Sequence, residues 1–377
     1  MTYSSPPPDP NPAPNCLDST KNFDQQMMQR CLQLARQALG QTAPNPLVGC
    51  VIVQDGVIVG EGFHPRAGQP HAEVFALRQA GERARGATVY VNLEPCNHIG
   101  RTPPCSEALI AAGVARVVVG MIDPDPRVAG SGVERLRDAG IEVLVGVEEA
   151  ACQELNEAFV YRVLHHRPFG ILKYAMTLDG KIATTSGHSA WVTSPAARHQ
   201  VHQLRAACDV IIVGGNTVRR DNPLLTSRQA NHTPLRVVMS QSLDLPLDAQ
   251  LWDTTVAPTL VLTEANHQPP IQEKLTDRGV NVLEIVPLTP YAVMAYLYEQ
   301  GFMSVLWECG GKLAASAIAD GAVQKVLAFI APKIIGGATA PSPVGDLGLE
   351  QMGDALQLER VRWQSVGPDL LVEGYLA

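Results

Sequence analysis

The sequence lacks any run of about 18 consecutive apolar residues, the length that a membrane-spanning helix needs. Its first residues contain no apolar segment and almost no basic residues, so neither a secretory signal nor a transit peptide is expected. The eight cysteines are scattered over 377 residues, which argues against a disulfide scaffold. These absences predict a soluble chain in a reducing, cytoplasmic compartment, without a membrane partner.

Positive charge is also in short supply, because 29 lysines and arginines face 37 acidic residues and leave a net charge of −8. Such a surface repels phosphate backbones, so we expect no nucleic-acid partner, although a basic pocket can still bind a small anion. Hydrophobic residues make up 46% of the chain, enough to fill two cores. The length suggests two or three domains, and a homo-oligomer is compatible with the sequence but is not indicated by it.

Proline and turn residues divide the chain. Six prolines precede Asn15 with few large apolar groups, so residues 1–22 are predicted to be a disordered tail. Order is predicted to begin at Phe23, in a helix whose apolar face runs from Phe23 to Ala38. A helix predicted over 149–164 ends before Pro168, a helix breaker. The predicted domains are therefore 23–167 and 168–377.

Hydrophobic patterning predicts strands and helices that alternate in both domains, which is typical of an α/β fold with a mostly parallel sheet. The predicted strands are 48–53, 57–59, 88–93, 116–119, 141–147, 170–175, 210–213, 235–239, 259–262, 280–285, 304–307 and 326–330. The other predicted helices are 106–112, 132–139, 195–207, 291–300 and 313–319.

The strongest chemical signal is His71-Ala72-Glu73 followed by Pro95-Cys96 and by Cys105. One imidazole and two thiolates give zinc three ligands and leave its fourth position open to water. Glu73 is then free to carry protons, as in zinc deaminases, where the metal activates water and a glutamate serves the base and the leaving ammonia. We predict that His71, Cys96 and Cys105 are zinc ligands and that Glu73 is catalytic. A structural zinc site, or buried cysteines without metal, are the alternatives.

Eight residues separate the two cysteines, whereas that signature has two. The segment 93–105, LEPCNHIGRTPPC, closely resembles the L-E-P-C-S-H-x-G-R-T-P-P-C segment of the riboflavin-biosynthesis deaminases, as do 43–49 (APNPLVG) and 62–64 (GFH). The resemblance implies that Asn45 and His64 contact the pyrimidine and ribose, and that Arg101 and Thr102 hold a 5′-phosphate. Taken alone, Arg101 also fits a solvated loop charge and Asn45 a turn between prolines.

The second half has no G-x-G-x-x-G after a strand, so the Rossmann fingerprint is absent. Glycine pairs at 214–215 and 310–311 follow predicted strands instead, where backbone N–H groups can approach a phosphate, although such glycines also serve packing. The segments 173–183 (KYAMTLDGKIA), 189–193, 204–205, 221–228 and 308–311 are similar, in order, to the riboflavin reductase domain. The fold of that domain is like dihydrofolate reductase.

The resemblance to this bifunctional deaminase and reductase family implies zinc and NADPH as cofactors and a small phosphorylated pyrimidine as substrate. Deamination of 2,5-diamino-6-(5-phosphoribosylamino)pyrimidin-4-one precedes reduction of the ribosyl C1′ to a ribityl chain. The implied NADPH-site residues are Ala175, Trp191, Thr217, Asp221, Gly310, Gly311, Lys312, Leu313, Ala314, Ala315 and Ser316. The implied substrate-site residues are Ser189, Arg205, Leu225, Arg228 and Glu308, with Lys173 close to the reacting carbon and Lys173 or Glu308 handling the proton. Core packing is the alternative for Trp191, and a turn for residues 221–223.

The expected fold is α/β throughout, a cytidine-deaminase-like α/β/α sandwich followed by a dihydrofolate-reductase-like domain. One alternative is a zinc deaminase of another base, such as a tRNA adenosine, with a degenerate C-terminal binding domain. Another is a zinc-stabilised interaction protein without activity. The acidic charge, the long cysteine loop and the glycine turns argue against the first, and the free Glu73 argues against the second.

Overall fold

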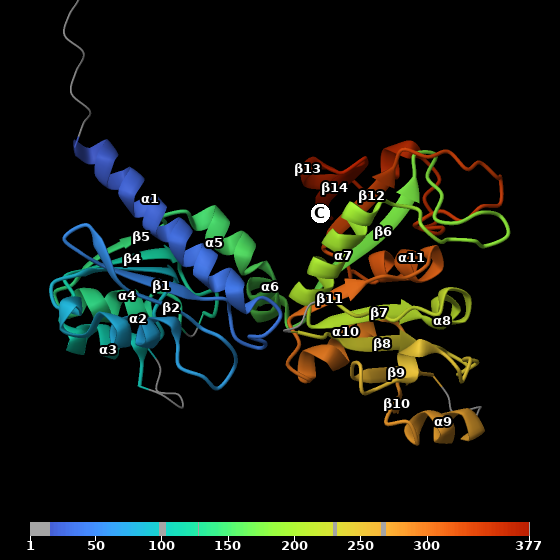
Figure 1. Cartoon of the computed structure of the whole chain (residues 1–377), viewed down its shortest axis with the longest axis horizontal. Helices are drawn as coiled ribbons and strands as arrows, with labels where there is room; N and C mark the ends of the chain where they lie inside the picture. Colours follow the sequence, from blue (N-terminus) through green and yellow to red (C-terminus); the bar gives the residue numbers. More distant parts are fainter. Residues whose placement is uncertain (1–15, 98–102, 127, 229–231, 265–268, 377) are drawn as a thin grey trace, which may run out of the picture. The chain divides into compact units, whose positions relative to one another are not determined.

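The computed structural model of the chain describes residues 16–97, 103–126, 128–228, 232–264 and 269–376 (Figure 1). The chain forms two compact units, each with its own sheet. The first comprises residues up to Ala38 together with Leu47–Asn156, and the second comprises Leu39–Pro46 and Glu157–Ala377. None of the described helices is both long enough and apolar enough to cross a membrane.

The first unit is built on a five-stranded sheet of order β2-β1-β3-β4-β5 in the described part of the chain. Its strands are β1 (Gly49–Gln54), β2 (Val57–Phe63), β3 (Thr88–Leu93), β4 (Arg116–Met121) and β5 (Glu142–Val145). The predicted hairpin is confirmed, because β1 pairs antiparallel with β2 around Asp55 and Gly56, whose φ angles of 52° and 76° suit a two-residue turn. β1 also pairs antiparallel with β3, so only β3, β4 and β5 run parallel and the sheet is mixed rather than mostly parallel.

Helices cover both faces of this sheet. They are α1 (Cys16–Ala35), α2 (Ala72–Ala80), α3 (Cys105–Ala112), α4 (Ser131–Asp138) and α5 (Glu149–Leu155), with short 3₁₀ turns η1 (Arg36–Ala38) and η2 (Gly81–Ala84). Figure 1 shows α1 and α5 on one face and α2, α3 and α4 on the other. The second face holds a core of small and branched side chains, among them Ala76 and Leu109, against the valines of β3 and β4.

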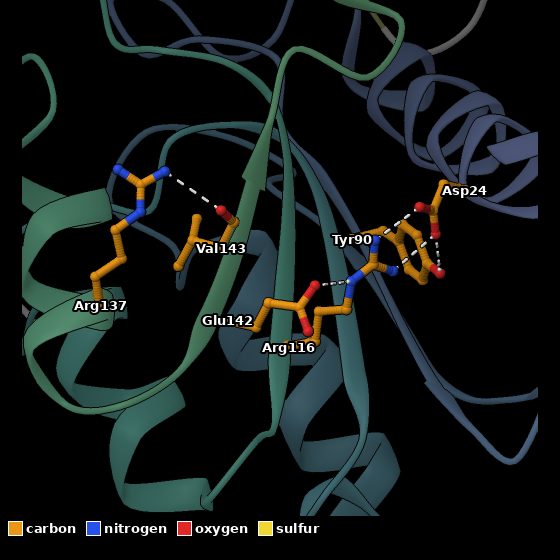
Figure 2. A network of polar contacts seen from close by, with 6 residues as sticks. All are labelled: Asp24, Tyr90, Arg116, Arg137, Glu142 and Val143. Atoms are coloured by element: carbon orange, nitrogen blue, oxygen red, sulfur yellow. Dashed lines mark hydrogen bonds and ion pairs between the residues drawn. The ribbon is translucent and has the colours of Figure 1, made fainter. Parts of the chain in front are cut away.

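A buried polar network attaches α1 to the sheet (Figure 2). Asp24 on α1 is 3% exposed and accepts two hydrogen bonds from the Arg116 guanidinium, at 2.9 and 2.8 Å. The Tyr90 hydroxyl donates a third, at 2.8 Å, and Arg116 Nε reaches Glu142 on β5 at 3.1 Å. One carboxylate on the helix is therefore tied to β3 and β4, and through Arg116 to β5.

The second unit contains a nine-stranded sheet of order β10-β9-β8-β7-β11-β6-β12-β14-β13 in its described residues. The strands from β10 to β12 in this order run parallel, and β14 and β13 add an antiparallel hairpin at one edge. The strands are β6 (Phe169–Thr177), β7 (Val210–Gly214), β8 (Leu235–Met239), β9 (Thr259–Thr263), β10 (Asn281–Glu284), β11 (Ser304–Trp307), β12 (Lys325–Ala331), β13 (Leu358–Val366) and β14 (Asp369–Leu376).

Two cores lie on opposite faces of this sheet, since successive side chains of a strand alternate. The helices are α6 (Glu157–His165), α7 (Pro195–Ala207), α8 (Gly215–Asp221), α9 (Pro269–Thr276), α10 (Pro290–Glu299) and α11 (Gly311–Ala319), with 3₁₀ turns η3 (Gln250–Trp252) and η4 (Met352–Asp354). Residues of α7, α8 and α9 join one core, and residues of α10 and α11 join the other. The parallel pairing of β11 with β7 and with β6 places the ends of these three strands side by side at the centre of the sheet.

Two predicted elements are corrected, and several elements were missed. The first helix begins at Cys16, so the described part of the predicted tail, residues 16–22, is helical. The predicted helix 149–164 is two helices, because Asn156 leaves the helical course and its side chain bonds to the backbone N–H and C=O of Leu47, at 2.8 and 3.0 Å. The pattern also missed α8, α9 and the hairpin of β13 and β14. The rest of the predicted tail, residues 1–15, lies outside the described residues.

Candidate functional site

The three predicted zinc ligands converge in the first unit. His71 immediately precedes α2, Cys96 follows β3, and Cys105 is the first residue of α3. Their ligand atoms all lie within 4.8 Å of one another, with His71 Nδ1 at 3.2 Å from Cys105 Sγ and 3.5 Å from Cys96 Sγ. An imidazole and two thiols in such a cluster match the ligands that zinc prefers.

The two thiols interact closely, and each shifts the pKa of the other. The hydrogen bond from Cys105 lowers the pKa of Cys96 to about 4, and the same contact raises the pKa of Cys105. The backbone N–H of Cys105 donates to Cys96 Sγ as well, at 3.4 Å. A thiolate at Cys96 is therefore favoured, which is the form of cysteine that binds a metal ion.

Glu73 lies on the first turn of α2 and is 3% exposed. Its Oε2 atom is buried without a hydrogen-bond partner among the described residues. Burial raises the pKa of Glu73, and the charge of Cys96 raises it further. A buried carboxylate oxygen left unpaired costs free energy unless a water or ligand meets it, so this orphan atom fits a site that receives a metal-bound water.

Glu94 is a further residue that sequence reasoning did not single out. Its buried carboxylate follows β3 and accepts hydrogen bonds from the backbone N–H groups of Asp123, Gly130, Gly132 and Val133, at 2.8 to 3.2 Å. It therefore fixes the start of α4 beside the Pro95-Cys96 turn. Its place in the LEPC motif was a signal, but the sequence does not say which amides it would meet.

The residues expected to bind the pyrimidine differ in what the structure shows. His64 is buried, its ring meets that of His71 edge to face at 5.6 Å, and its Nδ1 lies 3.0 Å from the Pro70 carbonyl. A carbonyl can only accept, so Nδ1 carries the proton, and burial lowers the pKa of His64. Asn45 belongs to the segment 39–46 that groups with the second unit, and its role stays a prediction. Arg101 and Thr102 lie outside the described residues.

A buried ion cluster occupies the centre of the second unit. Glu308, at the end of β11, accepts two hydrogen bonds from Arg205 of α7, at 2.6 and 3.0 Å, and lies 3.5 Å from Lys173 Nζ on β6. Burial alone raises the pKa of Glu308, but the charges of Arg205 and Lys173 outweigh it and lower the value to about 2. Burial also lowers the pKa of Lys173, partly offset by Glu308. The structure therefore brings together three of the charged residues predicted for the reductase, Lys173, Arg205 and Glu308.

Each nitrogen of the Arg205 guanidinium donates a hydrogen bond to another group of the protein. Besides Glu308, its Nη1 donates to the carbonyl of Thr226 at 3.2 Å. His202, one turn earlier on α7, contacts the same carbonyl through Nδ1 at 3.2 Å. His202 was not predicted, and only its spacing of three residues from Arg205 on the helix could have indicated it.

The residues expected at the NADPH site lie at the turns that follow β7 and β11. Gly310 precedes α11, and a Cβ built there meets nothing within 4 Å, so its backbone borders open space. Gly311 is needed for packing, because a Cβ there would lie 2.7 Å from the Ser342 carbonyl. An open glycine at the N-terminus of a helix fits a dinucleotide phosphate. The following predicted residues, Lys312, Leu313, Ala314, Ala315 and Ser316, form the body of α11, where Ala314 and Ala315 are buried.

Other predicted residues lie around these turns. Trp191 is 69% exposed, so core packing is the wrong interpretation, and the Arg198 guanidinium stands 4.4 Å from its ring centre. Ser189 donates to Asp221 at 2.8 Å. Thr217 of α8 and Ala175 of β6 are half-buried, and Arg228 is exposed. Leu225 packs its side chain into the core, so any contact it makes with a ligand comes from its backbone.

Comparisons with known proteins match both units. The family model of the cytidine and deoxycytidylate deaminase zinc-binding region matches residues 21–121, and that of the RibD C-terminal domain matches residues 168–372. The riboflavin biosynthesis protein RibD of Synechocystis sp. is 64% identical over 354 residues, which cover 94% of this chain and 96% of the relative. RibD of Escherichia coli is 41% identical, covering 92% of this chain and 98% of its own.

Solved structures agree over nearly the whole chain. RibD of Acinetobacter baumannii superposes with a TM-score of 0.84 at 39% identity, covering 95% of this chain and 99% of that one. A diaminohydroxyphosphoribosylaminopyrimidine deaminase/5-amino-6-(5-phosphoribosylamino)uracil reductase from Thermotoga maritima gives 0.84 at 36% identity, covering 95% and 100%.

Proposed function

Because this chain belongs to the RibD family of riboflavin biosynthesis proteins, we propose that its two units carry out two successive steps on one phosphorylated pyrimidine. A zinc-dependent deaminase is followed by an NADPH-dependent reductase, and the predicted fold class and enzyme class are confirmed. The tRNA-deaminase alternative is not favoured, since the RibD C-terminal domain matches in full order. The observation that carries the proposal is the cluster of His71, Cys96 and Cys105 together with Glu73, whose buried Oε2 has no hydrogen-bond partner among the described residues.

In the deaminase, His71, Cys96 and Cys105 hold zinc, and Glu73 carries protons. Bound zinc supplies a hydroxide at neutral pH. Glu73 would accept the proton that this water gives up and deliver it to a ring nitrogen. It would then take the proton of the newly added hydroxyl, which becomes the carbonyl, and pass it to the amine that leaves as ammonia. Burial raises the pKa of the Glu73 carboxyl. A carboxyl with a raised pKa can both accept and donate a proton near neutral pH, which suits this role. His64 stands against His71 and is assigned to the substrate, with Asn45.

In the reductase, bound NADPH supplies the hydride. We assign the cofactor to the open turn at Gly310 and α11, together with Trp191, Thr217, Asp221 and Ala175. Lys173 is the only cation of the cluster with a mobile proton, since Arg205 stays charged throughout the working range. Lys173 therefore provides the proton that accompanies hydride addition at the ribosyl C1′, and Glu308 orients Lys173 and Arg205.

The substrate is assigned from the relatives. The Thermotoga maritima protein is described as acting on a diaminohydroxy-phosphoribosylamino-pyrimidine and on the corresponding uracil. In this chain Arg101 and Thr102 are assigned to the 5′-phosphate during deamination, and Ser189, Arg205, Leu225 and Arg228 during reduction. The occupied donors of Arg205 leave Arg228 as the more accessible guanidinium for the phosphate.

We assign residues up to 167 to the deaminase domain, residues 168–377 to the reductase, and the whole enzyme to the cytoplasm. The contacts of α6 favour a division after Asn156, whereas the match to the RibD C-terminal domain begins at 168. Expression of chains that end at 156 and at 167, assayed for zinc content and ammonia release, decides between these boundaries.

The test of the function is a two-step assay of the purified, zinc-loaded chain. With the diaminopyrimidine substrate alone we expect release of ammonia, and with NADPH added we expect its oxidation after deamination. Ammonia release from adenosine-containing tRNA, or no ammonia release at all, would contradict the proposal.

A further inference from the structure

The loop from Asn222 to Arg228 joins α8 toward β8 and carries two residues assigned to the substrate phosphate, Leu225 and Arg228. Its backbone is left-handed at Asn222, Leu225 and Arg228, with φ of 41°, 53° and 54°. Residues other than glycine rarely adopt this conformation, because it costs conformational free energy. The loop keeps this course because the surrounding structure imposes it.

Side chains from outside the loop hold its carbonyl oxygens at every second residue. The bonds run from Gln250 Nε2 to Asn222 O at 2.9 Å, from Arg236 Nη1 to Leu224 O at 3.2 Å, and from Arg205 Nη1 to Thr226 O at 3.2 Å. Arg205 belongs to the reductase cluster already described. Arg236, which bonds to the middle of these carbonyls, is wholly buried.

Arg236 on β8 is an unusual residue to find in a core. Its side chain is 0% exposed, its Nη2 donates to the carbonyls of Asp253 and Ala257 at 2.8 and 2.6 Å, and its Nε has no partner among the described residues. Within the same described part of the chain, Arg236 makes no ion pair with a carboxylate. Burial lowers the pKa of Arg236 to about 10.

A buried cation without a paired anion costs free energy, and an apolar side chain of similar volume packs such a site without that cost. The planar guanidinium offers something that an apolar chain or a lysine cannot, since its donors reach carbonyls of two separate segments in one fixed geometry. Here those segments are the substrate loop, at Leu224, and the turn 253–257. The buried guanidinium of Arg236 is therefore suited to hold these two segments in a fixed position relative to each other.

We propose that Arg236 is a positioning residue of the reductase, which sets the substrate loop from its buried side so that the Leu225 backbone and Arg228 meet the phosphate. It does not touch the substrate. The proposal rests on the assignment of Leu225 and Arg228 to the phosphorylated substrate. It adds to that assignment the element that holds the loop in its left-handed course.

The test uses the full-length, zinc-loaded enzyme with Arg236→Met, which keeps the volume and removes the donors, and with Arg236→Lys. For Arg236→Met we expect the KM for the phosphorylated ribosylaminouracil to rise about tenfold or more, as loss of hydrogen bonds from a charged donor implies. The KM for NADPH and the deaminase rate should stay within about twofold, because the loop serves neither. Arg236→Lys should recover part of the loss. With the dephosphorylated substrate, wild type and Arg236→Met should have similar KM values.

Controls separate positioning from general stability. Arg278→Met removes another arginine whose donor meets a carbonyl, that of Leu247, and should leave every constant unchanged. If Arg236→Met does not fold, Gln250→Ala decides, because it releases the exposed Asn222 carbonyl alone and should raise the same KM about threefold. A KM unchanged in the folded variants, or raised equally for NADPH and for the dephosphorylated substrate, would overturn the proposal. Failure of the wild type to reduce the substrate would instead overturn the assigned function.

Discussion

At the scale of single residues, the deaminase site depends on one carboxylate whose surroundings leave an oxygen unpaired. Changing Glu73 to Gln keeps the shape and the buried position but removes the proton carrier. We expect zinc content to stay at the wild-type level and ammonia release to fall at least ~100-fold, while the reductase is unchanged. Metal analysis and both assays on the purified variant measure this. Glu82→Gln, an exposed glutamate of the same unit, is the matched control and should be neutral. Near-normal deamination by Glu73→Gln would refute the role.

The reductase cluster makes a prediction about pH. Glu308 has a pKa of about 2, below its ordinary value of 4.5, so its stabilising charge is complete above pH 4.5 and is lost only as the pH falls toward 2. The wild-type reductase should therefore show no titration of Glu308 in any practical assay range. In Glu308→Gln, Lys173 loses the partner that offsets its burial, so its pKa should fall further.

The measurement is the pH dependence of the reductase rate for Glu308→Gln against the wild type. We expect the reductase rate to drop at least ~10-fold. The decline of the rate at alkaline pH should also begin at a lower pH than in the wild type, because deprotonated Lys173 cannot deliver a proton. Glu373→Gln, which disturbs a different lysine pair on β14, should leave the profile where it was. An unshifted alkaline limb in Glu308→Gln would argue that Lys173 is not the proton donor.

At the scale of elements, α1 is attached to its sheet by a network that titrates. Burial alone raises the pKa of Asp24, but hydrogen bonds from Arg116 and Tyr90 outweigh it and lower the pKa below 3.8. This contribution to stability is present above pH 3.8 and is lost as the pH falls through the lower folded value. Asp24→Asn should cost about 2 kcal/mol in the free energy of unfolding at neutral pH, as for hydrogen bonds to a charged group.

Denaturant unfolding of the wild type and Asp24→Asn at several pH values measures this contribution. The difference between the two proteins should shrink as the solution is acidified, since the wild type then loses the same charge. Asp138→Asn, an exposed aspartate at the end of α4, should change stability little. A pH-independent difference would mean that the charge of Asp24 is not what holds α1.

The elements that were predicted well from the sequence are those marked by a clear apolar pattern or by a residue that starts or ends a helix. Strand β3 and helix α7 begin and end at the predicted residues, because one is a bounded apolar run and the other starts at Pro195. Helix α8 was missed because it is short and polar, and β13 because nearly all its residues are exposed. The break at Asn156 depends on Leu47, 109 residues away in the sequence, and no local pattern carries that information.

The residues of the candidate site likewise differ in how far the sequence could predict them. The zinc ligands and Glu73 share a motif whose chemistry fixes their roles, and the structure brings the ligands together. Arg205, Lys173 and Glu308 were predicted only through resemblance, since their contact joins three elements far apart in the chain. That Arg205 bonds to the Thr226 carbonyl, and that Arg236 is buried beneath the same loop, required coordinates.

At the scale of the whole molecule, the two activities belong to separate units, so we expect that one can be lost without the other. Removal of zinc by a chelator should abolish ammonia release, while NADPH-dependent reduction of the deaminated substrate stays within about twofold, because no reductase residue belongs to the metal cluster. Dialysis against a chelator, assay of each step, and restoration with zinc measure this. The control is the zinc-loaded protein after a mock dialysis without chelator. A parallel fall of both activities would contradict the independence.

The contact grouping of residues 39–46 has a consequence for how such a chain can have been assembled. A head-to-tail gene fusion of two complete enzymes leaves a single passage of the chain between their folds. Here the chain changes unit after Ala38, after Pro46 and after Asn156, so the N-terminal half contributes a short strap to the fold of the C-terminal half. A protease that cuts only between Asn156 and Glu157 should therefore give two pieces that still co-elute under native conditions, because the first piece retains the strap. Shuffling the halves between relatives should succeed only when residues 39–46 travel with the reductase that they pack against.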